Sequence, residues 1–229
     1  MASLLPAPDD HAFADGEALA RPEAPGVLGS ILERLASVLS RHHQRRLSRE
    51  VWGRFERASV MAPNVRLGAG ARLVNRGNPE NVRIGAGSVL RGIIRVERGG
   101  TLDIGDFVYI GDDTLISAAS SVIVGPMTLI AHGVQILDNT SHPLVAEQRA
   151  AHWRMILGIE AKQPVEIESR PVRIGEQCWI GLNSIVLPGT TIGDRSVISA
   201  GSVVQGNVPP DVIFRCAAGG KPSCHPIAA

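Results

Sequence analysis

The chain has 229 residues with a formal net charge of +1, and 44% of the residues are hydrophobic against 20% charged. A charge this close to zero gives no concentrated basic face, so nucleic acid is not among the expected partners. No stretch approaches 18 apolar residues, so we expect neither a signal peptide nor an integral membrane segment. Eight aromatic residues (four Phe, three Trp, one Tyr) beside 25 Gly favour a core of small and branched aliphatic side chains.

The cysteines and the N-terminal region set further limits. Cys178, Cys216 and Cys224 have no metal-ligand spacing and leave one thiol unpaired, which favours a reduced, cytoplasmic compartment. Residues 1–26 are rich in Ala, Pro, Asp and Glu without periodicity, and we predict a flexible leader there.

Residues 27–60 change character, because apolar residues recur at helical spacing on both sides of a basic segment. We predict an amphipathic helical segment of one or two helices that covers the open end of the domain that follows. Contact of this basic and apolar segment with a membrane surface is the alternative, and the sequence leaves it open.

A six-residue rhythm dominates the rest of the chain. Between residues 172 and 204 aliphatic residues recur six apart, most of them followed by a small residue, at Ile174, Ile180, Val186, Ile192, Ile198 and Val204. This period fits neither one helix face nor an alternating strand, and it indicates a parallel β-helix of hexapeptide repeats. We expect each aliphatic side chain to point inward from a flat face, with the small residue letting the chain turn the corner. The pattern predicts an all-β solenoid domain over residues 61–215.

The rhythm stops over residues 138–171 and then resumes in register. Insertions of this length in a compact domain are uncommon and often functional. We therefore predict a loop excursion at 138–171, with the functional residues at its base, and a C-terminal tail at 216–229.

Four motifs carry a resemblance to a known family. They are Ser141-His142-Pro143, the V-x-I-G-x-x-x-W-I-G run of Val172–Gly181, Pro188–Asp194 and Ile198–Val204. Together they resemble the hexapeptide-repeat acyltransferases, which include maltose, galactoside, nodulation-factor and capsular-polysaccharide O-acetyltransferases. The resemblance implies a left-handed parallel β-helix, a homotrimer with sites between subunits, and transfer of an acetyl group from acetyl-CoA to a hydroxyl of a sugar or surface-glycan acceptor. It implies no metal.

His142 is the predicted general base. An alcohol attacks a thioester poorly unless its proton is removed, and imidazole titrates near working pH. From the residues alone His142 is either this base or a surface histidine of the loop, and the resemblance favours the base. His132, His152 and His225 are weaker candidates.

The acceptor and CoA sites rest on the resemblance. The family's acceptor-binding Asn is absent, because that position is Gly111, followed by Asp112 and Asp113. We expect Asp113, Asp138 and Asn139 to bind the acceptor, an ordinary turn role being the alternative. For Asp138 and Asn139, orientation of the His142 imidazole is a further alternative. For CoA the resemblance implies Trp179, Gly181, Ala200 and Gly201 along the last coils, and Lys221 for a phosphate.

Two other functions fit the same fold. A zinc carbonic anhydrase needs three His ligands across a subunit seam, for which only His132 and His142 are expected near one another. A non-catalytic β-helix scaffold is the other, and the long His-bearing insertion argues against it.

Overall fold

The computed structural model describes residues 27–216 and 220–227, so the expected leader at 1–26 lies outside the described residues. The chain divides into two compact units, Met1–Gln44 and Arg45–Ala229, which are described separately. One helix, α1 (Val27–Ala58), begins in the first unit and ends in the second. Among the described helices none combines the length and the apolar character needed to cross a membrane.

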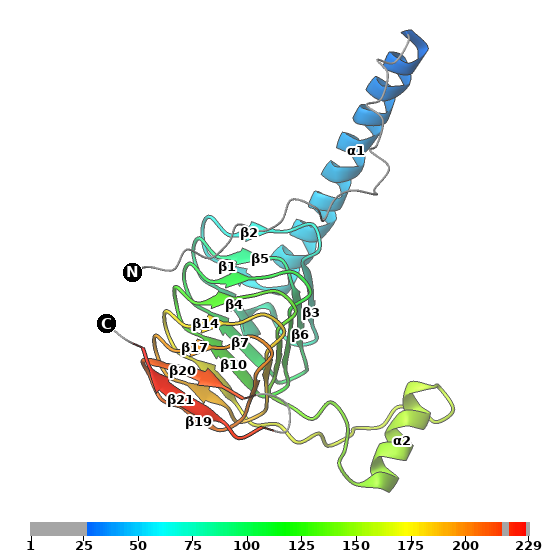
Figure 1. Cartoon of the computed structure of the whole chain (residues 1–229). Coiled ribbons are helices and arrows are strands. Elements are labelled where there is room, and N and C mark those ends of the chain that lie inside the picture. The colour runs from blue at the N-terminus through cyan, green and yellow to red at the C-terminus, as the bar shows by residue number, and fades with distance from the viewer. Residues whose placement is uncertain (1–26, 217–219, 228–229) are drawn as a thin grey trace, which may run out of the picture. The chain divides into compact units, whose positions relative to one another are not determined.

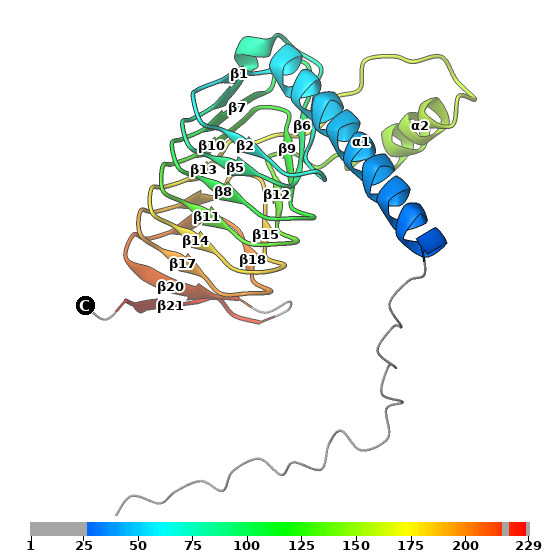
Figure 2. The same ribbon diagram turned by 90° about the horizontal axis from the view of Figure 1, so that it is seen from above.

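The second unit is a parallel β-solenoid, as predicted, whose strands stack into three sheets (Figures 1 and 2). Sheet A contains, in order of pairing, β1 (Val60–Met61), β4 (Val82–Ile84), β7 (Thr101–Ile104), β10 (Ser121–Val124), β13 (Val172–Ile174), β16 (Thr191–Ile192) and β19 (Asn207–Val208). Sheet B contains β2 (Arg66–Leu67), β5 (Val89–Leu90), β8 (Tyr109–Ile110), β11 (Leu129–Ile130), β14 (Trp179–Ile180), β17 (Val197–Ile198), β20 (Val212–Arg215) and β21 (Ser223–Pro226). Sheet C contains β3 (Arg72–Asn75), β6 (Ile93–Val96), β9 (Leu115–Ala118), β12 (Gln135–Leu137), β15 (Ile185–Val186) and β18 (Val203–Val204). Each coil therefore runs from sheet A to B to C, and a 3₁₀ turn (Pro79–Asn81) leads into β4.

The hexapeptide aliphatics form the core. The six side chains from Ile174 to Val204 that set the rhythm are 0–1% exposed, and the equivalent residues of the earlier coils join the same cluster. The prediction of inward-facing aliphatics is confirmed. Because every strand inside the stack pairs with the coil before and after it, the apolar side chains are buried between successive coils.

The corners are built differently from the prediction. Where a glycine follows the aliphatic, it is required by the next coil and not by the turn, since a Cβ on Gly85 would lie 2.3 Å from the carbonyl carbon of Gly105. The turn itself uses a left-handed residue two positions later, such as Asp113 at φ 58° or Gln177 at φ 54°. The small residue is therefore needed for the close stacking of the coils. The turn is made by the left-handed residue two positions after it.

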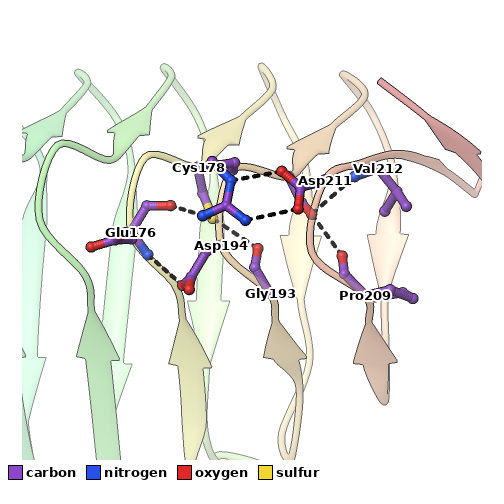
Figure 3. A network of polar contacts seen from close by, with 9 residues as sticks. Glu176, Cys178, Gly193, Asp194, Pro209, Asp211 and Val212 are labelled. Carbon is purple, nitrogen blue, oxygen red and sulfur yellow. Dashed lines mark hydrogen bonds and ion pairs between the residues drawn. The ribbon is translucent and has the colours of Figure 1, made fainter. Parts of the chain in front are cut away.

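The A-to-B corner also shows how the coils are joined by polar groups (Figure 3). The Asp194 carboxylate accepts the backbone N–H of Glu176 at 3.0 Å, and the buried Cys178 thiol donates to the Gly193 carbonyl at 3.2 Å. Burial raises the pKa of that thiol, because the thiolate would lose its hydration. Cys178 is thus a structural member of the corner.

Two ends of the solenoid contain features that the six-residue rhythm does not predict. At the N-terminal end Phe55 of α1 is fully buried in the core, and the Asn75 side chain donates to the Ala58 carbonyl at 2.9 Å. At the other end β21, within the expected tail, pairs antiparallel with β20. The left hand of the coil stays an expectation from the resemblance, and the predicted domain limits stay predictions.

Candidate active site

The insertion between β12 and β13 leaves the solenoid at the C-to-A corner and contains a helix, α2 (Ala146–Ile156). Figures 1 and 2 both show α2 outside the coils. The two ends of the insertion meet at its base, where Asn139 and Ser169 form an isolated antiparallel bridge and Arg170 N–H donates to the Asp138 carbonyl at 2.7 Å. The chain is therefore clamped where it departs from the repeat.

Asp138 lies inside this corner and is 0% exposed. Its two carboxylate oxygens accept the backbone N–H groups of Ala119 and Ser120 at 2.7 and 2.8 Å. Charge-assisted bonds to backbone donors of this kind are strong, and they hold the corner of one coil to the start of the insertion. The expectation that Asp138 binds the acceptor needs correction, because both oxygens face the neighbouring coil.

Asn139, the next residue, is also buried and stabilises the start of the insertion through side-chain hydrogen bonds. It is 6% exposed, and its amide donates to the Ser117 hydroxyl at 3.2 Å and to the Asp138 carboxylate at 2.9 Å. Its side-chain oxygen accepts the Ser141 N–H at 3.0 Å, an Asx-type turn that helps hold Ser141 at a left-handed φ of 60°. Asn139 therefore shapes the turn that presents His142, and its burial also argues against contact with an acceptor.

The His142 turn closes on itself through backbone bonds. His142 N–H donates to the Thr140 carbonyl at 2.7 Å, and the Thr140 hydroxyl donates to the His142 carbonyl at 2.9 Å. Pro143, which follows, is buried, whereas the His142 side chain is exposed. The imidazole is thus held on a fixed turn at the mouth of the insertion while its ring stays open to a ligand.

The imidazole of His142 meets a second imidazole. Its Nδ1 lies 3.3 Å from Nδ1 of His152 in α2, with ring centroids 5.1 Å apart. His152 also lines a cavity of about 420 Å³ with Arg76, Lys162, Met155 and neighbouring residues. Sequence spacing identified both histidines, but only the folded insertion brings them together.

Asp113 lies on another corner, between sheets B and C. It is exposed, and the preceding Asp112 forms a two-pronged ion pair with Arg91 at 2.8 and 2.9 Å. This pairing raises the pKa of the Arg91 guanidinium and holds Asp112. Asp113 itself is left pointing into solvent at the corner, where it is open to a ligand.

His132 stacks on that same B-to-C corner. Its Nδ1 accepts the Asp112 backbone N–H at 3.1 Å, and its ring packs edge-on to Tyr109 at 6.4 Å between centroids. The expectation that His132 and His142 lie near one another is wrong within one chain, because they occupy different corners. Among the described residues no group of three His, Cys, Asp or Glu side chains converges as a metal site would.

The residues expected to bind CoA follow the B-to-C corner and the face beside it. Trp179 points outward from sheet B between Leu129 and Val197 and is 53% exposed. Ala200 and Gly201 are exposed at the corner, whereas Gly181 is buried with its Cα against the backbone of Ala200. Lys221 is exposed just before β21. Gly181 therefore has a packing role whatever it binds.

The two corners are far apart within one chain. Gly133 of the B-to-C corner and Asp138 of the C-to-A corner are separated by one extended strand, or about 16 Å at about 3.3 Å per residue. The backbone bond from Gly133 N–H to the Asp112 carbonyl at 2.9 Å and that from Gly201 N–H to Leu182 at 2.8 Å show that this corner is one continuous column. One chain thus places His142 on one edge and Asp113 with Gly201 on another.

Comparison with known families agrees with the repeat. Residues 171–205 match the family described as the hexapeptide repeat of succinyl-transferase. The chain is 36% identical over 115 residues to galactoside O-acetyltransferase of Escherichia coli, covering 50% of each chain, and 38% identical over 127 residues to nodulation protein L of Rhizobium meliloti, covering 56% of this chain and 62% of the relative. WcaF of Escherichia coli, named for colanic acid biosynthesis, is 29% identical over 58% of this chain and 64% of its own length. The chain thus spans less than two thirds of these relatives.

Solved structures share the fold. A variant of AntD, an N-acyltransferase from Bacillus cereus, in complex with dTDP and coenzyme A aligns with a TM-score of 0.56 at 16% identity, over 72% of this chain and 82% of AntD. AntD with dTDP and 3-hydroxybutyryl-CoA aligns with a TM-score of 0.55, over 73% and 82%. At this identity the likeness concerns the coiled fold alone. The repeat, the solenoid and the sequence relatives together make the chain similar to the hexapeptide-repeat acetyltransferases.

Proposed function

We propose that the protein is an acetyl-CoA-dependent O-acetyltransferase whose acceptor is a sugar or surface-polysaccharide hydroxyl, and that His142 is its general base. The observation that carries the proposal is the turn at residues 139–142. Buried Asp138 and Asn139 brace it, and it presents an exposed imidazole where the long insertion interrupts the hexapeptide rhythm. Relatives named as galactoside O-acetyltransferase and as a colanic acid biosynthesis protein support the acceptor class.

The chemistry needs few parts. Nε2 of His142 takes the proton of the acceptor hydroxyl as the oxygen attacks the thioester carbonyl, which gives a tetrahedral intermediate. Collapse of this intermediate breaks the carbon–sulfur bond, and the leaving thiolate takes the same proton from His142. The step balances without a metal or a covalent enzyme intermediate, and it depends on holding the two substrates in line.

We further propose a homotrimer with the site between subunits. His142 and the expected CoA residues Ala200 and Gly201 lie on different edges of the prism, about 16 Å of strand apart. A neighbouring copy that sets its B-to-C corner against the C-to-A corner of the first would bring both sets together. The outward Leu129 and Trp179, 44% and 53% exposed, give such an assembly an apolar surface on sheet B.

The test is release of free CoA thiol from acetyl-CoA in the presence of a panel of sugars and oligosaccharides. His142→Ala should lower kcat by about 10²–10⁴-fold, the range for loss of a general base, while the trimer stays assembled. His225→Ala, at an exposed position of β21, is the matched control and should keep full activity. Undiminished transfer by His142→Ala, or stoichiometric zinc in the purified protein, would contradict the proposal.

A further inference from the structure

Two imidazoles face each other in the insertion through the same kind of nitrogen. Nδ1 of His142 and Nδ1 of His152 are 3.3 Å apart, which is hydrogen-bonding distance, and the rings are tilted by 51°. A neutral imidazole carries its proton on one nitrogen and a lone pair on the other. Two facing lone pairs would repel, so one of the two Nδ1 atoms carries the proton that lies between the rings.

We propose that His152 is a positioning residue for the base: its Nδ1 accepts from Nδ1–H of His142 and thereby leaves the lone pair of His142 on Nε2. This inference rests on the proposed function of His142. The reverse arrangement, with the proton on His152 Nδ1, would place the proton of neutral His142 on Nε2, where no lone pair would be free to receive a hydroxyl proton. Only the first tautomer pair is compatible with a base at Nε2.

No other group is placed to select this tautomer. Among the hydrogen bonds of the described residues, the contact with His152 is the one polar contact of the His142 ring. The backbone N–H and carbonyl of His142 are already used inside its own turn. A histidine that acts as a base needs a second group to fix its proton and its ring orientation, and here that group is an imidazole.

Helix α2 is itself anchored to the His142 turn. The Arg149 guanidinium donates to the Pro143 and Leu144 carbonyls at 3.2 and 2.7 Å. Arg149 and His152 are three residues apart in the helix, so they lie on the same face. The contact that fixes the helix and the contact that would fix the base therefore come from one side of α2.

During transfer His152 keeps its own protons. The acceptor proton moves to His142 Nε2, and the resulting imidazolium donates its Nδ1–H to the neutral His152 ring, which shares the positive charge through that bond. The proton then leaves from Nε2 to the CoA sulfur, and the pair returns to its first state. His152 touches no reacting atom in this scheme, so it is not a catalytic residue.

The test compares two isosteric replacements in the full-length chain. The side-chain oxygen of His152→Asn occupies the place of Nδ1 and still accepts a hydrogen bond, whereas His152→Leu has the same size and no acceptor. We expect His152→Asn to keep kcat within about threefold and His152→Leu to lose roughly tenfold to a hundredfold, with the KM for acetyl-CoA unchanged in both. Trp153→Leu, on an exposed position of the same helix, is the control and should match the wild type. Equal loss in the Asn and Leu variants would overturn the proposal.

A spectroscopic readout separates this proposal from the proposed function. Two-bond ¹H–¹⁵N correlation spectra of the histidine rings should show wild-type His142 protonated at Nδ1 at neutral pH, and the signal should move to Nε2–H in His152→Leu. Nε2–H on His142 in the wild-type protein would overturn the pair, whatever the activity. If the wild type releases no thiol with any acceptor but shows Nδ1–H, the proposed function fails and the imidazole pair stands.

Discussion

The A-to-B corner and the C-to-A corner are made from the same repeat but differ in what their polar residues do. At the A-to-B corner Asp106 and Asp194 are at least partly exposed, and each accepts one backbone N–H from a neighbouring coil. At the C-to-A corner Asp138 is fully buried, accepts two backbone N–H groups and passes the contact on to Asn139. The single bond of the A-to-B corner recurs along the stack, whereas the bonds of Asp138 and Asn139 stabilise only the turn that carries His142.

This difference distinguishes the corners that stabilise the solenoid from the corner at which we propose the chemistry. At a regular corner the same contacts recur from coil to coil, and they serve the stacking of the coils. Substituting a residue there should therefore lower the free energy of unfolding. The interrupted corner departs from the repeat only because Asp138 and Asn139 satisfy the backbone groups that the insertion leaves behind. The His142 side chain is exposed at no cost to the core, because two buried polar residues hold its turn from beneath.

The largest effect should come from the stacking glycines of the regular corner. A Cβ on Gly125 would lie 2.6 Å from the backbone of Gly175, so Gly125→Ala must push two coils apart and should cost about 3 kcal/mol or more. Gly70→Ala is the matched control, because its Cβ would meet only the Arg91 carbonyl at 3.6 Å, and it should stay within about 1 kcal/mol. Denaturant unfolding measures both, and equal stabilities would show that the coils yield more easily than their spacing indicates.

The brace under His142 should come next. Asp138→Ala leaves the N–H groups of Ala119 and Ser120 without their acceptor in a buried corner, which should cost about 2–4 kcal/mol and lower kcat more than KM. Asp106→Ala removes one exposed bond, to Ala86 N–H, and should cost less than about 1 kcal/mol with unchanged transfer. Chemical denaturation and thiol release on the same preparations test the pair. A larger loss of stability or activity in Asp106→Ala than in Asp138→Ala would contradict the proposed difference between the two corners.

The smallest effect belongs to the exposed ion pair of Arg195 and Asp211, 2.6 Å between Nε and Oδ1. The hydrogen bond from Arg195 lowers the pKa of Asp211, so the folded state takes up this proton less readily than the unfolded chain. The pair therefore contributes stability above about pH 4 and loses it as the pH falls through the lowered folded pKa. Thermal unfolding of wild type and Asp211→Asn should differ slightly at pH 7, the difference should shrink as the pH falls below about 4, and high salt should shrink it too. A difference that grows toward pH 3 would contradict this sign.

The sequence predicted the solenoid because the six-residue rhythm is a direct image of inward-facing side chains, as the buried run from Ile174 to Val204 confirms. The same reasoning left the roles of Asp138 and Asn139 open between acceptor binding and a turn, since an acidic residue at the end of a repeat looks identical whether it is solvated or buried. It also placed His132 near His142, because residues ten apart in sequence seem close, whereas the extended strand β12 carries them to different corners. The approach of His152 to His142 depends on how the insertion folds back, which no local spacing encodes.

The C-terminal strand β21 has a consequence for how the molecule melts. It covers sheet B alone, so in the described chain sheet A ends at β19 and sheet C at β18, while Phe55 fills the opposite end of the core. Coils bonded only to their neighbours come apart from the least protected end. We therefore expect fraying to begin near Ala200 and Gly201, where sheet C ends, and to reach the coil that carries His142 only later. The wall proposed for the large, flexible cosubstrate would then be softer than the turn proposed to hold the base.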